Sequence, residues 1–144
     1  VAMCALDARF HVRSAQRCHR TIVATDFFQA PLMTVLEPDE LLVEIEVPAQ
    51  PAGARAAFAE HARTHGDFAL AGAAVVRSGS EDAAIALLGA GPTPLRVPDA
   101  EAALRRGASA AEAARIAGAE LDDDYRRALT TELVRRALEE AGAA

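Results

Sequence analysis

The sequence predicts an α+β fold in which an antiparallel sheet is covered on one face by helices. Two observations support this prediction. Up to residue 88, short apolar runs alternate with turn residues, which is typical of antiparallel strands joined by tight connections. After residue 97, alanine-rich stretches with helix-capping residues dominate. Strands first and helices after is the element order of an α+β domain.

The composition limits the kinds of protein that this chain can be. With 144 residues, 51% of them hydrophobic, it is long enough for one domain, or for one domain and a piece of another. All 15 basic residues are arginine, which excludes a P-loop lysine and a Schiff-base lysine. A net charge of −6 argues against nucleic-acid binding, and no apolar run reaches the roughly 18 residues of a membrane span. Two cysteines do not make a disulfide framework, so we expect a reduced, cytoplasmic setting.

The first 24 residues predict a hairpin. Residues 5–13 alternate, with Phe10 and Val12 on an apolar face and charged or histidine side chains on the other. Residues 14–17 form a turn, and residues 19–24 return as a second strand. Such a hairpin has no evident partner in this chain, and a lone hairpin is marginal in water, so we expect it to pack on something else.

The next segment predicts a short helical turn, a polar turn and a strand. Thr25 is a candidate helix N-cap, and residues 37–40 form the turn. Residues 41–47 alternate as a strand, which places Leu41, Val43, Ile45 and Val47 on one face and Leu42, Glu44 and Glu46 on the other. Leu42 therefore interrupts the charged face.

The rest of the chain predicts a hairpin and then three helices. Residues 54–64 do not decide between helix and strand, whereas residues 68–77 and 83–88 read as paired strands. The Gly/Pro-rich segment 89–94 marks the switch to helices. These cover 98–106 with Gly107 as C-cap, 109–117 with the capping box Ser109–Glu112, and 122–141.

No group of residues predicts catalytic or metal-binding chemistry. His61 and His65 have the i,i+4 spacing that can hold a metal on a helix, but a third ligand is missing. Cys18 and His19 are adjacent in an expected strand and would face opposite ways. Glu44 and Glu46 share a strand face, where solvated charge is the simpler interpretation. From the residues alone we expect no catalytic residue and no metal site.

Four segments, in order along the chain, resemble one family. TDFFQAPLMTVLEPDELLVEIEVP (25–48) resembles the start of the C-terminal domain of the FAD-binding (medium) subunit of molybdenum hydroxylases, the carbon monoxide, xanthine and aldehyde dehydrogenase relatives. FAEHARTHGDFALAGAAVV (58–76) resembles its Phe…Arg-Arg-x-Gly-Asp-Phe-Ala segment. GAGPTPLRVPDAEAAL (89–104) resembles its Gly-x-x-x-x-Pro-x-Arg crossover, and DDDYRRALTTELVRRAL (122–138) its closing helix. Together they span nearly the whole chain.

The resemblance implies a domain organisation and a role. Residues 1–23 would be the tail hairpin of the preceding FAD-binding domain, 24–40 a connecting segment, and 41–144 a C-terminal domain of three or four antiparallel strands followed by about three helices packed on one face. The complete subunit would be an oxidoreductase component, with FAD passing electrons from iron–sulfur clusters to an acceptor. Its partners would be a molybdenum-cofactor large subunit and a 2Fe–2S small subunit. Because the loops that hold the FAD pyrophosphate belong to the preceding domain, we expect this chain alone to be inactive and to bind no FAD.

Two positions correspond to flavin contacts in the family. The position at the start of the 41–47 strand falls on Leu42, whose apolar side chain would contact the flavin or the neighbouring domain, or would instead pack on the hairpin. The second position, a lysine in some members, falls on Ala59, where no charged contact is possible. A different class of function stays open beside this one, namely a non-catalytic α+β protein-interaction module that no longer binds flavin.

Overall fold

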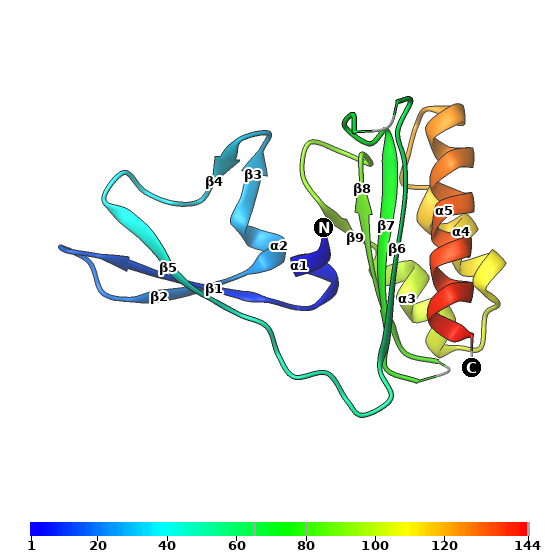
Figure 1. Cartoon of the computed structure of the whole chain (residues 1–144), viewed down its shortest axis with the longest axis horizontal. Helices are drawn as coiled ribbons and strands as arrows, with labels where there is room; N and C mark the ends of the chain where they lie inside the picture. Colours follow the sequence, from blue (N-terminus) through cyan, green and yellow to red (C-terminus); the bar gives the residue numbers. More distant parts are fainter. Residues whose placement is uncertain (65, 80, 144) are drawn as a thin grey trace.

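The computed structural model describes residues 1–64, 66–79 and 81–143. Its strands form three sheets, in the orders β2–β1–β5, β3–β4 and β6–β7–β8–β9. In Figure 1 the first sheet lies on one side of the molecule and the four-stranded sheet on the other, with helix α1 between them. The strands are β1 (Arg9–Ser14), β2 (Arg20–Val23), β3 (Phe28–Ala30), β4 (Met33–Thr34), β5 (Glu40–Glu46), β6 (Arg55–His61), β7 (Ala71–Arg77), β8 (Ala83–Leu88) and β9 (Leu95–Arg96).

The predicted hairpin exists, but it has a partner within the chain. β1 pairs with β2 on one side and with β5 on the other, both antiparallel. The prediction of a hairpin without a partner was therefore wrong, because a strand that follows the connecting segment returns to its open edge. The strand expected to begin the C-terminal domain is thus the third strand of the first sheet.

A β-bulge corrects the predicted faces of β5. His11 lies opposite Glu44 and Val12 lies opposite Leu42, so Val43 is an extra residue that has no counterpart in β1. Residues directly opposite each other share a face of the sheet. Leu42 therefore lies on the apolar face with Val12, and its predicted place on the glutamate face was wrong because strict alternation assumes an unbroken ladder.

The N-terminal residues differ from the prediction in two further places. Ala2–Ala5 form a helical turn, α1, so the strand begins only at Arg9. The second short helix, α2, is Ala24–Phe27 and its N-cap is Val23, which makes no side-chain capping bond. Thr25 is thus inside this helix and not its cap, and its hydroxyl donates to Asp26 instead.

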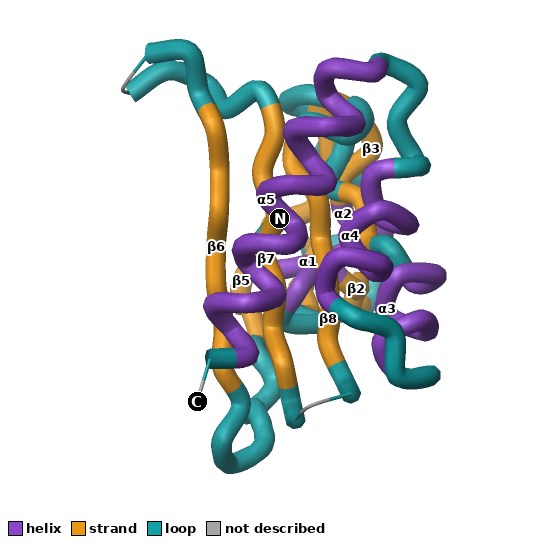
Figure 2. Tube along the Cα trace, turned by 90° about the vertical axis from the view of Figure 1, so that its right-hand side faces the viewer, coloured by secondary structure: helices purple, strands orange, loops and turns teal. Residues whose placement is uncertain are grey.

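The C-terminal half confirms the predicted α+β architecture. Residues 55–61, which the sequence left undecided, form strand β6 at the edge of the four-stranded sheet. Helices α3 (Pro98–Arg105), α4 (Ala110–Gly118) and α5 (Asp124–Gly142) form one layer over this sheet, as Figure 2 shows. The two layers bury one core, whose sheet residues include Ala57, Ala73, Val75, Ile85 and Leu87 and whose helix residues include Val134, Ala137 and Leu138.

The helix ends follow from residues that the sequence identifies. The Ser109 hydroxyl accepts the backbone N–H of Glu112 at 3.2 Å, and the Asp123 carboxylate accepts that of Arg126 at 2.7 Å. Gly107, with a φ of +87°, follows α3 and lets the N–H of Ala108 reach the carbonyl of Ala103 at 3.0 Å. The predicted caps at Ser109 and Gly107 are confirmed, and Asp123 is a third cap that the structure adds.

Arg96 joins α1 to the four-stranded sheet. Its Nε donates to the Glu101 carboxylate at 2.8 Å, while Nη1 donates to the carbonyl of Cys4 at 2.7 Å and to the carboxylate of Asp7 at 2.5 Å. Burial alone would lower the pKa of Arg96, but the hydrogen bonds and charges of Glu101 and Asp7 raise it above its ordinary value. This arginine therefore fixes α1 on the face of the sheet that the large helices leave open.

Candidate functional site

An apolar groove lies between α1 and the open face of the four-stranded sheet. It has a volume of about 230 Å³. Its lining combines the N-terminal segment with the two strands β6 and β7, and it includes Ala2, Ala5, Leu6, Ala56, Phe58, Ala74 and Val76. Almost every lining side chain is aliphatic or aromatic, so the groove suits an apolar, flat group.

The strand register explains why this face stays open. Phe58 lies opposite Ala74 and Ala56 lies opposite Val76, so these four side chains share one face. Their neighbours Ala57 and Val75 point to the helix layer and belong to its core. Because three of the four groove residues on the strands are Ala or Val, a planar group can approach the backbone closely, and Phe58, which is 52% exposed, stands at the side of this surface.

Neither residue predicted to contact the flavin lines this groove. Leu42 is 37% exposed and lies in the first sheet, opposite Val12. Ala59 lies in β6, opposite Ala73, and packs against the helix-side core. The two positions lie in different sheets, on strands β5 and β6 that Figure 1 shows apart, and the flavin contacts expected of them stay predictions.

The groove residues could have been found by periodicity. Once residues 55–61 are taken as a strand, Ala56 and Phe58 share one face and Ala57 and Ala59 the other. The alanine content of this segment concealed that pattern, because alanine also favours helix.

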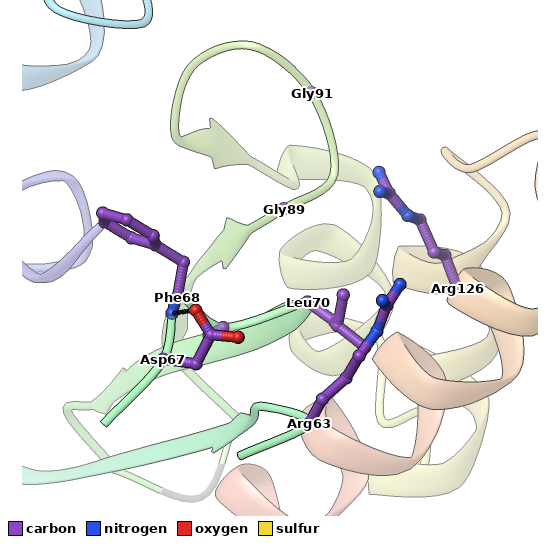
Figure 3. A pocket seen from close by; sticks show the side chains of 8 residues that line it. Arg63, Asp67, Phe68, Leu70, Gly89, Gly91 and Arg126 are labelled. Atoms are coloured by element: carbon purple, nitrogen blue, oxygen red, sulfur yellow. Dashed lines mark hydrogen bonds between the residues drawn. The ribbon is translucent and has the colours of Figure 1, made fainter. Parts of the chain in front are cut away.

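A second, polar cleft lies at the other end of the sheet, where β6 ends and β7 begins. Its volume is about 360 Å³, and Arg63, Asp67, Phe68, Gly89 and Arg126 are among its lining residues. Figure 3 shows the side chains of Arg63 and Arg126 extending toward the same space, whereas Phe68 turns away from them. The Asp67 carboxylate accepts the backbone N–H of Phe68 at 2.8 Å.

The buried cysteine is poorly suited to act as a nucleophile. Cys4 is buried, and burial raises the pKa of its thiol, which disfavours the reactive thiolate. Its sulfur lies 3.6 Å from the carbonyl of Ala24. Cys18 is free and exposed. Its neighbour His19 stacks on His11, with ring centroids 5.3 Å apart.

Charge pairs hold the first sheet together around β5. Arg20 binds Glu40 through two hydrogen bonds of 2.8 and 2.6 Å, and these bonds, together with the N–H of Glu37, lower the pKa of Glu40 to about 2. The Arg20 guanidinium also donates to the carbonyl of Val35. The Glu40 carboxylate therefore joins β2 to the start of β5 and has a structural role.

The described residues contain neither a cluster of metal ligands nor a membrane-spanning helix. Among residues 1–64, 66–79 and 81–143, no three His, Cys, Asp or Glu side chains lie together as metal ligands would. His65, one of the two histidines considered for a metal, lies outside the described residues. In the same ranges no helix combines the length and the apolar character needed to cross a bilayer.

Comparison with known proteins identifies relatives of this chain. A family described as "FAD binding domain in molybdopterin dehydrogenase" matches residues 1–50. The nicotine 6-hydroxylase medium subunit of Paenarthrobacter nicotinovorans is 39% identical over 99% of this chain and 55% of its own length. The carbon monoxide dehydrogenase medium chain of Hydrogenophaga pseudoflava is 36% identical over 96% of this chain and 54% of its own length.

A solved structure shows the same fold. Carbon monoxide dehydrogenase of Oligotropha carboxidovorans, in its reconstituted form, contains a chain that superposes with a TM-score of 0.86 at 31% identity. The superposition covers 99% of this chain and 55% of that one. The chain thus spans about half the length of the relatives that it matches.

Proposed function

This chain belongs to the family of FAD-binding medium subunits of the molybdenum hydroxylases, and we propose that it forms the C-terminal half of such a flavoprotein subunit and helps to position FAD. The groove between α1 and the four-stranded sheet carries the proposal. One wall comes from the segment that matches the FAD-binding family, residues 1–50, and the other from strands β6 and β7. A cofactor held there would contact both halves of the chain.

The groove fits one part of FAD. Its apolar lining suits the planar isoalloxazine ring, which Phe58, Ala56 and Ala74 would contact. No arginine lines this groove, so the pyrophosphate would be bound by the residues that precede this chain in its longer relatives. FAD, when bound, supplies one- and two-electron chemistry, which links iron–sulfur clusters to an acceptor. The side chains of this chain would orient the ring and exclude water from it.

The strand pairing favours a revised domain boundary. β5 belongs to the first sheet and β6 to the second, and the family match ends at residue 50. We place the junction in the Pro-containing segment 47–54, and not before residue 41. In this account Leu42 belongs to the FAD-binding domain, where a flavin contact stays a prediction, and Ala59 supports the helix side of the C-terminal domain.

The proposed assembly follows from the relatives. Several of them are named as medium or complex subunits of dehydrogenases and hydroxylases. We propose that this protein likewise assembles with a large subunit carrying a molybdenum cofactor and a small subunit carrying 2Fe–2S clusters. The substrate would be oxidised on the large subunit, and no catalytic residue would lie in this chain.

A blocking substitution tests the groove. Ala56 is exposed at the groove, so Ala56→Phe fills the space without disturbing the core. In the full-length protein we expect this variant to bind FAD at least about tenfold more weakly, equal to roughly 1.4 kcal/mol, as measured by quenching of flavin fluorescence. The matched control is Ala128→Phe on the exposed side of α5, which should leave the affinity unchanged.

The outcomes separate the two classes of function. Unchanged FAD affinity in Ala56→Phe would contradict a flavin site in this groove. No FAD binding by the unmodified full-length protein would favour the alternative, an α+β interaction module that has lost the flavin.

A further inference from the structure

Two arginines, Arg63 and Arg126, line the polar cleft. Eight other arginines form ion pairs with carboxylates, namely Arg9, Arg17, Arg20, Arg96, Arg105, Arg127, Arg135 and Arg136. Within the described ranges, no carboxylate pairs with the guanidinium of Arg63 or of Arg126. Other arginines, among them Arg13, Arg106 and Arg115, likewise have no carboxylate partner in these ranges, so the distinctive feature of Arg63 and Arg126 is that both line one cleft.

The two guanidiniums come from different elements. Arg63 follows β6, and Arg126 lies in the first turn of α5. The backbone N–H of Arg126 donates to the carboxylate of Asp123, the N-cap of this helix, at 2.7 Å. Figure 3 shows both side chains extending to the space beside the loop that contains Gly89 and Gly91. Because α5 is anchored on the sheet by its buried face, Arg126 is attached to a rigid support.

The one carboxylate among the lining residues, that of Asp67, forms no ion pair with either arginine within the described ranges. Asp67 lines the same cleft, but its Oδ1 accepts the N–H of Phe68 and fixes the turn before β7. In the loop opposite, Gly91 has no side chain that could block the approach of a ligand to its backbone. The cleft thus offers two cations and accessible backbone to a group that enters it.

We propose that this cleft binds the phosphate group of a small molecule. Arginine is the side chain best suited to such a group, because its planar guanidinium donates two parallel hydrogen bonds to two oxygens of one phosphate. Two guanidiniums from separate elements can clamp a tetrahedral oxyanion, whereas a planar carboxylate would engage only one of them in this way. The site is separate from the apolar groove, which contains no arginine and shares no lining residue with the cleft.

Titration of the full-length protein tests the site. Inorganic phosphate and glycerol phosphate are added at constant ionic strength, with binding followed by calorimetry, and acetate serves as the carboxylate probe. We expect saturable binding of at least one phosphate probe, and a loss of about tenfold in affinity for each of Arg63→Ala and Arg126→Ala, because each variant removes charge-assisted hydrogen bonds to the phosphate. Tighter binding of glycerol phosphate than of inorganic phosphate would identify a phosphate ester as the ligand. Equal binding of the two probes would identify the free phosphate ion as the ligand.

Controls keep the result specific. Arg115→Ala removes an exposed arginine of α4 outside the cleft and should change nothing. Arg126→Lys keeps the charge but loses the two-pronged geometry, so it should weaken binding as well. The absence of saturable phosphate binding, equal affinity for acetate, or full affinity in the Arg63→Ala and Arg126→Ala variants would overturn the proposal.

Discussion

Replacing Glu101 by alanine is expected to lower the free energy of unfolding by about 3–5 kcal/mol, the usual cost of leaving a buried ion pair without one partner. Glu101 is 6% exposed, and one of its oxygens accepts both Arg96 Nε at 2.8 Å and the backbone N–H of Ile85 at 2.9 Å. The variant would leave the Nε of a largely buried guanidinium and a buried strand N–H without an acceptor, while Nη1 of Arg96 would keep the Cys4 carbonyl and Asp7. Chemical denaturation of the full-length protein measures the loss.

Two variants distinguish the charge from the hydrogen bonds. Glu101→Gln retains an oxygen that can accept from Ile85 and Arg96 but removes the negative charge, so it should cost less than Glu101→Ala. Glu120→Ala removes an exposed carboxylate and should stay within about 0.5 kcal/mol of the unmodified protein. A cost for Glu101→Ala as small as that for Glu120→Ala would show that Arg96 does not depend on this partner.

Replacing Gly89 by alanine should also be strongly destabilising. Gly89 has a φ of +75°, and a Cβ at this position would lie 2.4 Å from the carbonyl oxygen of Leu70. The backbone conformation alone costs a residue with a side chain about 1–3 kcal/mol, and moving Leu70 away from the end of β8 adds to this. We expect a lower thermal midpoint, by roughly 3 °C or more, measured by calorimetry.

The control for this variant lies two residues further on. At Gly91 the nearest atom to an added Cβ is the carbonyl oxygen of Thr93 at 4.0 Å, and its φ is not in the left-handed region. Gly91→Ala should therefore be nearly neutral. If Gly89→Ala and Gly91→Ala lowered the thermal midpoint equally, the close approach of Leu70 to Gly89 would not be the cause of the destabilisation.

The glycine and the arginine of the Gly-x-x-x-x-Pro-x-Arg segment each have a structural role. Its glycine, Gly89, allows the chain to leave β8 against the backbone of Leu70. Its arginine, Arg96, pairs with Glu101 and holds the carbonyl of Cys4. The segment therefore joins the two halves of the chain, which explains how a stretch without chemistry of its own contributes to the placement of the groove.

The helices could be predicted from the sequence because their signals are local. Ser109 and Asp123 cap helices through side chains that lie three residues from the N–H groups that they bind. Gly107 ends α3 through its own backbone conformation. Information of this kind is contained within one turn of chain, so neither packing nor partners are needed to interpret it.

The first sheet could not be predicted in full because its decisive contacts are distant. The pairing of Val12 with Leu42 joins residues 30 positions apart. The bulge at Val43 moves Leu42 to the opposite face of β5 from the one expected, and no glycine or proline in the sequence marks it. For the same reason the sequence drew attention to Leu42 as an anomaly on a charged face, whereas the bulge gives it an ordinary place opposite an apolar residue. The groove likewise depends on contacts between distant residues, because α1 reaches the four-stranded sheet through tertiary contacts alone.

The visible absorption spectrum tests the central claim most directly. The full-length protein and the 144-residue chain are each purified and supplied with equal FAD, then separated from unbound flavin. We expect flavin bands in the full-length protein and none in the chain alone, because the chain would supply both walls of the groove for the ring but no site for the pyrophosphate. Stoichiometric FAD on the chain alone, or a full-length protein without flavin, would contradict this account.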